Sequence, residues 1–254
     1  MSEHVRVAVE DGVMRLTLAR AEKKNALTNA MYDALADALQ RADDDPAVRV
    51  VLFDAEGETF CAGNDLGDFT AVAAGSMPAE ALRATAFLTA LARARKPCVA
   101  AVQGAAVGIG TTLLLHCDLV FLAEDAVLST PFVNLAVVPE AASSLLLPAR
   151  IGHARAFAMF ALGESLDGRM AVTMGLANAA LPAAHLRDEA LAAARALAAK
   201  PPGALLATKQ LMRDSETLAA VMARENAAFV ECLRSPETAA ALRAFAQRRN
   251  PAHD

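Results

Sequence analysis

The sequence predicts an α/β protein with largely parallel strands, and three observations lead to this prediction. Short apolar runs at 48–55, 97–104 and 118–124 alternate with helical patterns at 78–95 and 110–117. The runs are apolar on both faces, which is typical of strands buried in a parallel sheet. After about residue 140 the strand signal fades and helical patterns dominate.

The first 46 residues predict a hairpin followed by a helix. Val5, Val7 and Val9 alternate with polar residues, and the alternation resumes at Met14, Leu16 and Leu18. Asp11-Gly12 between them is a typical two-residue hairpin turn. Thr28 is the predicted N-cap of a helix whose apolar face is Met31, Ala34, Leu35, Ala38 and Leu39. The acidic run and proline at 43–46 end that helix.

The C-terminal part predicts a helical appendage. A loop at 56–69 leads into a helical stretch. Helical patterns dominate 153–199, and 204–248 has the pattern of an amphipathic helix. The sequence KPPG at 200–203 is a strong helix break. We therefore expect a core domain over 1–199 and a separate helical region over 200–254.

Composition excludes several classes of protein. The 254 residues are 55% hydrophobic and 21% charged, which is typical of a folded chain with a substantial core. The net charge is −5, Trp is absent and Tyr occurs once, so we expect no nucleic-acid partner. The scattered cysteines and histidines show no metal-ligand spacing, which predicts reduced thiols and no metal site.

Targeting signals are also lacking in the sequence pattern. The N-terminus carries acidic residues and no apolar core of a signal peptide. The uncharged stretch 97–117 is interrupted by Gln103, His116 and three glycines, so a buried strand and a buried helix explain it better than a membrane span. The expected location is the cytoplasm, with no membrane partner.

The stretch GAAVGIGTTLLLHCD at 104–118 is the most informative loop. Its glycines have the wrong order for a dinucleotide fingerprint, and it lacks the GK[ST] of a phosphate-binding loop and the GxSxG of a nucleophile elbow. One interpretation is a tight turn with close helix–strand packing. Another is a helix start whose backbone N–H groups face a substrate oxygen, which would be half of an oxyanion hole.

Five motifs in order resemble the crotonase, or enoyl-CoA hydratase/isomerase, superfamily over essentially the whole chain. They are KKNALT (23–28), FCAGNDL (60–66), KPCVAAVQGAAVGIG (96–110), CDLVFLAEDAVLSTP (117–131) and AFAQRRNP (244–251). The resemblance implies a spiral of ββα units, with the C-terminal helices building a homotrimer or a dimer of trimers. It also implies a coenzyme A thioester as substrate and no tightly bound cofactor.

The resemblance further implies which residues act. The backbone N–H groups of Asn64 and Ile109 would bind the thioester oxygen. The substrate-binding residues would be Lys24, Asn25, Ala26, Ala62, Asp65, Leu66, Phe69, Gly108, Phe132, Leu135 and Arg248. Asp65 has a second interpretation as a helix or turn cap, and the phenylalanines Phe69, Phe87 and Phe132 have one as ordinary core residues.

The general base implied by the resemblance is Glu140. Hydratases of the superfamily use two glutamates, and this chain has Thr112 and Phe132 at those positions, neither of which can take a proton near neutral pH. The segment VPEAASS around Glu140 resembles peroxisomal-type Δ3,Δ2-enoyl-CoA isomerases, in which this glutamate is the sole acid and base. Ser143 and Ser144 would satisfy the next helix start or hydrogen-bond Glu140.

Three functions remain open from the sequence. The first is an isomerase that moves a double bond from C3 to C2 of an enoyl-CoA. The second is hydration or another enolate-based conversion of an acyl-CoA. The third is a catalytically silent acyl-CoA-binding protein, against which the presence of Glu140 argues.

Overall fold

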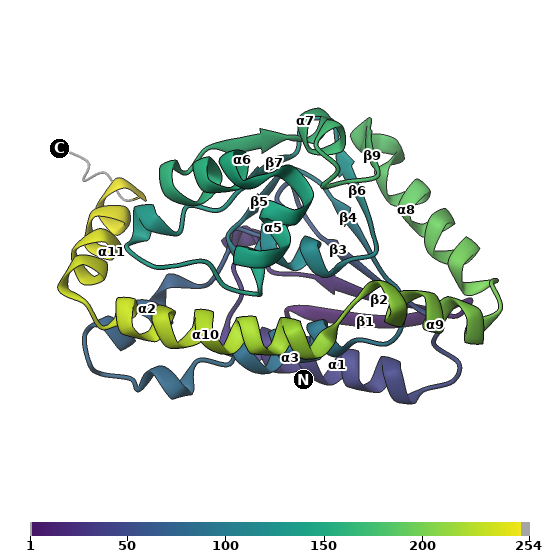
Figure 1. Ribbon diagram of the computed structural model, residues 1–254, viewed down its shortest axis with the longest axis horizontal. Coiled ribbons are helices and arrows are strands. Elements are labelled where there is room, and N and C mark those ends of the chain that lie inside the picture. Colours follow the sequence, from purple (N-terminus) through teal and green to yellow (C-terminus); the bar gives the residue numbers. More distant parts are fainter. Residues whose placement is uncertain (1, 250–254) are drawn as a thin grey trace.

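A mixed sheet runs through the centre of the computed structural model, which describes residues 2–249 (Figure 1). Within these residues one sheet has the strand order β1-β2-β3-β4-β6-β9. Its strands are β1 (Val5–Glu10), β2 (Val13–Leu18), β3 (Val50–Ala55), β4 (Cys98–Val102), β6 (Leu119–Ala123) and β9 (Ala179–Leu181). β1 and β2 are antiparallel, and all other neighbours are parallel. The α/β prediction is confirmed.

The predicted hairpin is also confirmed. β1 and β2 pair from Val5 opposite Leu18 to Glu10 opposite Val13. Asp11 and Gly12 make the turn with φ of 50° and 77°, because a two-residue hairpin turn needs positive φ at both positions. β1 is the edge strand of the sheet and is exposed after Val5.

The central strands are covered on both faces. Every residue of β3 and β4 is buried. Helix α8 (Ala183–Ala198) packs along β2, β3, β4 and β6 on one side of the sheet (Figure 1). This double coverage is the physical reason for the unbroken apolar runs in the sequence.

A second, smaller sheet was not predicted. It consists of β5 (Ala105–Val107), β7 (Val127–Ser129) and β8 (Ser165–Asp167) in the described chain. Helices dominate 153–199, as predicted, but the short strands β8 and β9 also lie inside this range. Three-residue strands are too short to show the two-residue period that marks longer ones.

The helices of the first half flank the sheet and the entrance to the site. Thr28 caps α1 (Asn29–Asp44) by accepting a hydrogen bond from the Met31 N–H at 3.3 Å, as predicted. α2 spans Leu66–Ala73 and α3 spans Ala84–Arg93. The helix expected over 78–95 is shorter because Leu82 is extended, with φ −68° and ψ 127°.

The second half is mainly helical. After β6 follow α5 (Ser143–Ile151), α6 (His153–Phe157), a π-helical turn (Ala158–Leu162) and α7 (Gly168–Thr173). After α8, the chain breaks at the predicted prolines and continues as α9 (Pro202–Met212), α10 (Ser215–Leu233) and α11 (Pro236–Arg249). The division at residue 200 and the trimer stay predictions.

The last two helices fold back onto the core. α10 contacts α2, α3 and α5, and α11 contacts α2 (Figure 1). Side chains from α10 and α11 therefore reach the region around α2. No helix of residues 2–249 is long and apolar enough to cross a bilayer.

Candidate active site

The glycine run combines both interpretations drawn from the sequence. It joins β5 to the short helix α4 (Ile109–Thr112), which continues as a 3-10 turn over Leu113–His116. Gly108 has φ 56° and ψ −117°, a conformation that essentially only glycine adopts. A Cβ on Gly110 would lie 2.7 Å from the Cys61 carbonyl oxygen, so this glycine permits close packing.

One of two isolated bridges joins the segments that carry the predicted oxyanion-hole residues. Cys61 pairs with Ala106 of β5, and Asn64 pairs with Leu27. The bridging hydrogen bonds use the N–H groups of Leu27 and Asp65, not that of Asn64. In residues 2–249 the N–H groups of Asn64 and Ile109 donate to no protein acceptor. Two free donors next to a left-handed glycine are the ingredients of an oxyanion hole.

Side chains around Asn64 hold that loop in place. The buried Tyr32 hydroxyl of α1 donates a hydrogen bond to Asn64 Oδ1. Asp65 caps α2 by accepting from the Gly67 N–H at 3.0 Å and pairs with Arg20 at 2.7 Å. The capping interpretation of Asp65 is confirmed. Arg20 also donates to the Ala26 carbonyl at 3.0 Å, which ties the KKNALT loop to the CAGND loop.

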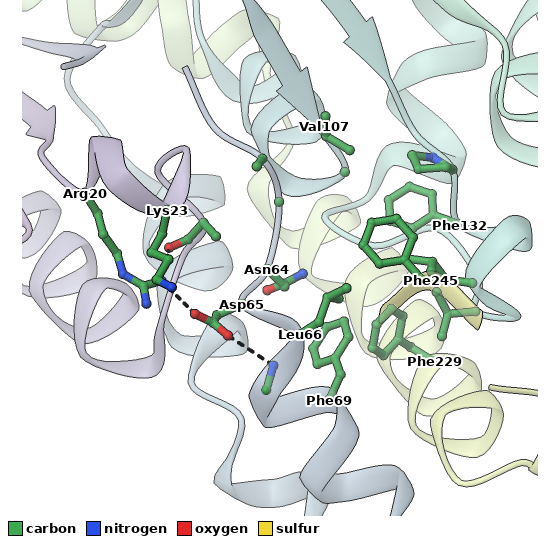
Figure 2. Close-up of a pocket in the computed structure, with 18 residues that line it drawn as sticks. Arg20, Lys23, Asn64, Asp65, Leu66, Phe69, Val107, Phe132, Phe229 and Phe245 are labelled. Atoms are coloured by element: carbon green, nitrogen blue, oxygen red, sulfur yellow. Dashed lines mark hydrogen bonds and ion pairs between the residues drawn. The ribbon is translucent and has the colours of Figure 1, made fainter. Parts of the chain in front are cut away.

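A cavity of about 380 Å³ opens in front of these loops. Figure 2 shows charged side chains on one side (Arg20, Lys23 and Asp65), aromatic side chains on the other (Phe132, Phe229 and Phe245), and Asn64 between them. A charged entrance beside an apolar interior suits a ligand with a polar carrier and an apolar tail. The predicted residues that line this cavity are Ala26, Ala62, Asn64, Asp65, Leu66, Phe69, Gly108, Phe132 and Leu135.

Other predicted residues lie outside the cavity wall. Lys24 is exposed with φ 52°, and its neighbour Lys23 lines the cavity instead. Asn25 is fully buried, and its amide donates to the carbonyls of Glu56 and Thr59. Ile109 is fully buried, and the residue before it, Gly108, is the one that lines the cavity.

The predicted C-terminal arginine and the predicted phenylalanines have different positions in the structure. Arg248 belongs to α11, and its side chain lies outside the described part of the chain. Phe87 is fully buried against Tyr32, so it is a core residue, whereas Phe69 packs edge-on against Phe229 at 5.6 Å.

Glu140 lies in the wall of a second cavity, of about 910 Å³, that is bordered by the same Phe69 and Phe229. Its side chain is buried, and Oε1 has no hydrogen-bond partner within the described residues. Burial, reinforced by the charge of Glu225, raises the pKa of Glu140 to about 8. Its charge also raises the pKa of Tyr32 and of Cys61, although burial is the larger cause for both. Glu140 is therefore electrostatically coupled to the side chain that fixes Asn64.

The turn that carries Glu140 is strained and held from two sides. Ala141 and Ala142 have φ of 63° and 53°, which costs about 1–2 kcal/mol for each residue with a Cβ. His116 Nε2 donates to the Ala141 carbonyl at 2.7 Å. Arg213 donates to the other ring nitrogen, and burial together with Arg213 lowers the pKa of His116 to about 3, so the ring is neutral.

On its other side the turn is held by Glu225 of α10. The Glu225 carboxylate accepts from the Ala142 N–H at 2.6 Å and from the N–H and hydroxyl of Ser144. The alternative in which Ser144 hydrogen-bonds Glu140 is wrong, because the Ser144 hydroxyl donates to Glu225. Ser143 Oγ is buried without a partner in the described chain.

Sequence reasoning missed Glu225, although a signal for it exists. It lies on the buried face of α10 that includes Leu218, Val221 and Phe229. A carboxylate on an apolar helix face is unusual unless it has hydrogen-bond partners. Here the partners are the Ala142 N–H and the N–H and hydroxyl of Ser144, at the start of α5.

The two positions at which hydratases of the superfamily carry glutamate hold no carboxylate. Thr112 is buried in α4, and its hydroxyl has no partner in the described residues. Phe132 lines the first cavity and packs against Phe160 at 5.9 Å. Among the described residues no three His, Cys, Asp or Glu side chains gather as metal ligands.

Comparison with known proteins agrees with this geometry. The model of the enoyl-CoA hydratase/isomerase family matches residues 8–254. The solved structure of Pseudomonas aeruginosa OdaA is 46% identical, with a TM-score of 0.91, over 96% of this chain and 99% of that one.

Relatives with two kinds of activity in their names are similar to the chain. Enoyl-CoA delta isomerase 2 of Rattus norvegicus is 34% identical over 85% of this chain, which spans 56% of that protein's length. The 2,3-dehydroadipyl-CoA hydratase of Escherichia coli K12 is 32% identical over 99% of this chain and 98% of its own. The chain thus belongs to the enoyl-CoA hydratase/isomerase family and has the crotonase fold.

Proposed function

We propose that the protein is a Δ3,Δ2-enoyl-CoA isomerase in which Glu140 is the only acid and base. The observation that supports this most directly is the buried Glu140 carboxyl, whose Oε1 has no hydrogen-bond partner among the described residues. It lies beside a cavity that shares Phe69 and Phe229 with the cavity lined by Asn64 and Gly108. Perturbed carboxyls next to preorganised donors are typical of enolate chemistry.

The proposed reaction needs one carboxylate. Ionised Glu140 removes a proton from C2 of a 3-enoyl-CoA, and the electrons pass through the C3–C4 double bond and the carbonyl to give a dienolate. The N–H groups of Asn64 and Ile109 stabilise the thioester oxygen, and one such donor typically contributes about 3–4 kcal/mol. The Glu140 carboxylic acid then returns the proton to C4, so that the double bond ends between C2 and C3.

Hydration by a pair of glutamates is less well supported. Thr112 and Phe132 stand where the superfamily's two glutamates would be, and neither can activate water. Because hydratases are among the relatives, hydration is still the alternative function, and the experiment must distinguish it from isomerisation.

The test compares the wild type with Glu140→Gln, and the exposed Glu189→Gln of α8 is the control. Each is incubated with trans-3-hexenoyl-CoA and, separately, trans-2-hexenoyl-CoA. Chromatography resolves the positional isomers, and mass spectrometry detects the gain of water. We expect isomerisation by the wild type and the control, and its loss by at least about 10³-fold in Glu140→Gln.

Other outcomes would contradict the proposal. Water addition that survives Glu140→Gln would mean a hydratase with another base. Tight thioester binding without any conversion would support the silent acyl-CoA-binding function.

A further inference from the structure

Glu225 lies where it can control the geometry of Glu140 from a distant part of the chain. α10 passes next to the start of α5 (Figure 1), and the Glu225 carboxylate meets three donors there. Oε2 accepts from the Ala142 N–H at 2.6 Å, while Oε1 accepts from the Ser144 N–H at 2.9 Å and from the Ser144 hydroxyl. All three are donors, so the ionised carboxylate, which only accepts, is the form that fits.

These contacts stabilise the turn before α5, which has an unfavourable backbone conformation and no side-chain cap of its own. Ala142 would ordinarily avoid its φ of 53°, and as the residue before α5 it offers no side-chain cap. Glu225 replaces the missing cap, because a carboxylate at a helix start satisfies free N–H groups and the helix dipole. The turn fixed in this way begins with Glu140, whose carbonyl accepts from the Ser143 N–H at 3.0 Å.

We propose that Glu225 is a positioning residue that holds the Glu140 carboxyl in the orientation required for proton transfer. This inference rests on the proposed role of Glu140 as the base. Glu225 acts through the turn 140–144 and also through its charge, which adds to the effect of burial in raising the pKa of Glu140. Both carboxyls line the second cavity, but only Glu140 takes part in the proton transfer of this scheme.

The titratable and charged groups around Glu140 determine how its ionisation should respond to the loss of the Glu225 charge. Glu225 on α10 is the charged group that acts on Glu140 among the described residues, and Tyr32 on α1 and Cys61 after β3 face it in neutral form. His116, behind Ala141, is neutral, and Arg213 binds it. Burial raises the pKa of Glu225, while its hydrogen bonds from Ser144 and Ala142 and the charge of Arg224 oppose that rise. Loss of the Glu225 charge should thus lower the pH at which Glu140 ionises.

The decisive variant is Glu225→Gln, with the exposed Glu231→Gln of the same helix as control. The glutamine oxygen can keep one set of contacts, while its NH₂ group faces a backbone N–H. We expect kcat for the 3-enoyl-CoA to fall about 10- to 100-fold with KM changed less than about threefold, because a displaced catalytic group costs that much in rate. The acidic limb of the kcat/KM profile should move to lower pH, and Glu225→Asp should restore part of kcat.

A second pair of variants keeps the test valid if Glu225→Gln folds poorly. Ser144→Ala removes one donor to Glu225 and leaves its charge, whereas Ser143→Ala removes a neighbouring hydroxyl without a protein partner. We expect a measurable loss of kcat in the first and none in the second.

The outcomes separate this inference from the proposed function. If Glu140→Gln is inactive while Glu225→Gln and Ser144→Ala keep wild-type kcat and an unmoved pH limb, Glu225 is only structural and the inference is overturned. If Glu140→Gln remains active, the proposed function itself fails, and the inference with it.

Discussion

Replacement of Glu140 by glutamine should stabilise the folded protein, and increasingly so as the pH rises. The carboxyl has a pKa of about 8 in the folded chain, against 4.5 for an unperturbed glutamate. Below pH 4.5 it is neutral in both states. Between 4.5 and about 8 the unfolded chain ionises while the folded chain keeps its proton, so the stability of the wild type falls across this range. Above about 8 both states are ionised and the loss is complete.

The magnitude follows from the two pKa values. A tenfold change in an equilibrium constant is about 1.4 kcal/mol, so the difference between 4.5 and about 8 corresponds to about 5 kcal/mol. At pH 5 only about 1 kcal/mol of this has been lost. The stabilisation by Glu140→Gln, which cannot ionise, should therefore grow by about 4 kcal/mol between pH 5 and pH 9.

The assay is unfolding in urea at several pH values, at one fixed protein concentration because subunit association would also shift the midpoint. Glu189→Gln, on the exposed face of α8, is the matched control and should follow the wild type. A stability difference between Glu140→Gln and wild type that stays constant from pH 5 to pH 9 would refute the assignment of a neutral, buried carboxyl.

The remaining predictions concern activity and the oxyanion hole. The kcat/KM of the wild type should rise with pH and level off above about 8, because the base must be ionised; a profile flat from pH 6 to 9 would contradict this. Gly108→Ala should lower kcat about 10²- to 10³-fold through backbone strain alone, since its Cβ would meet no atom within 4 Å. Gly110→Ala should instead lower the melting temperature markedly, because its Cβ would lie 2.7 Å from the Cys61 oxygen. Tyr32→Phe should lower the free energy of unfolding by about 1–3 kcal/mol, because Asn64 Oδ1 loses its donor; an unchanged urea midpoint would exclude this contact.

Local features of the chain were predictable from the sequence because their causes are local. Asp11-Gly12 specifies its turn, and Thr28 caps its own helix. The two glycines mark a loop that needs positive φ at 108 and close packing at 110. The pairing of Asn64 with Ile109 was implied by the resemblance and not by a local pattern, and the Cys61–Ala106 bridge joins the two segments that carry them.

Features that depend on contacts between distant segments were not predictable. Glu225 meets Ala142 and Ser144 across more than eighty positions of the chain, and no local pattern encodes such a pairing. Arg20 joins two loops through Asp65 in the same way. β8 and β9 were missed because a three-residue strand is defined by its neighbours rather than by its own period.

The proposed main-chain oxyanion hole has a consequence for how such a protein can change over generations. Every residue except proline has a backbone N–H, so a substitution of Ile109 would keep the proposed donor as long as Gly108 keeps its backbone conformation. The Asn64 side chain matters more, because its Oδ1 accepts the Tyr32 hydrogen bond that holds the loop. The carboxyl, in contrast, is a side chain and can be lost or moved by a single codon change. We therefore expect proteins of this fold to diverge by changing the position of the catalytic carboxyl. The proposed backbone donors to the thioester oxygen would be kept, while the reaction that follows would change.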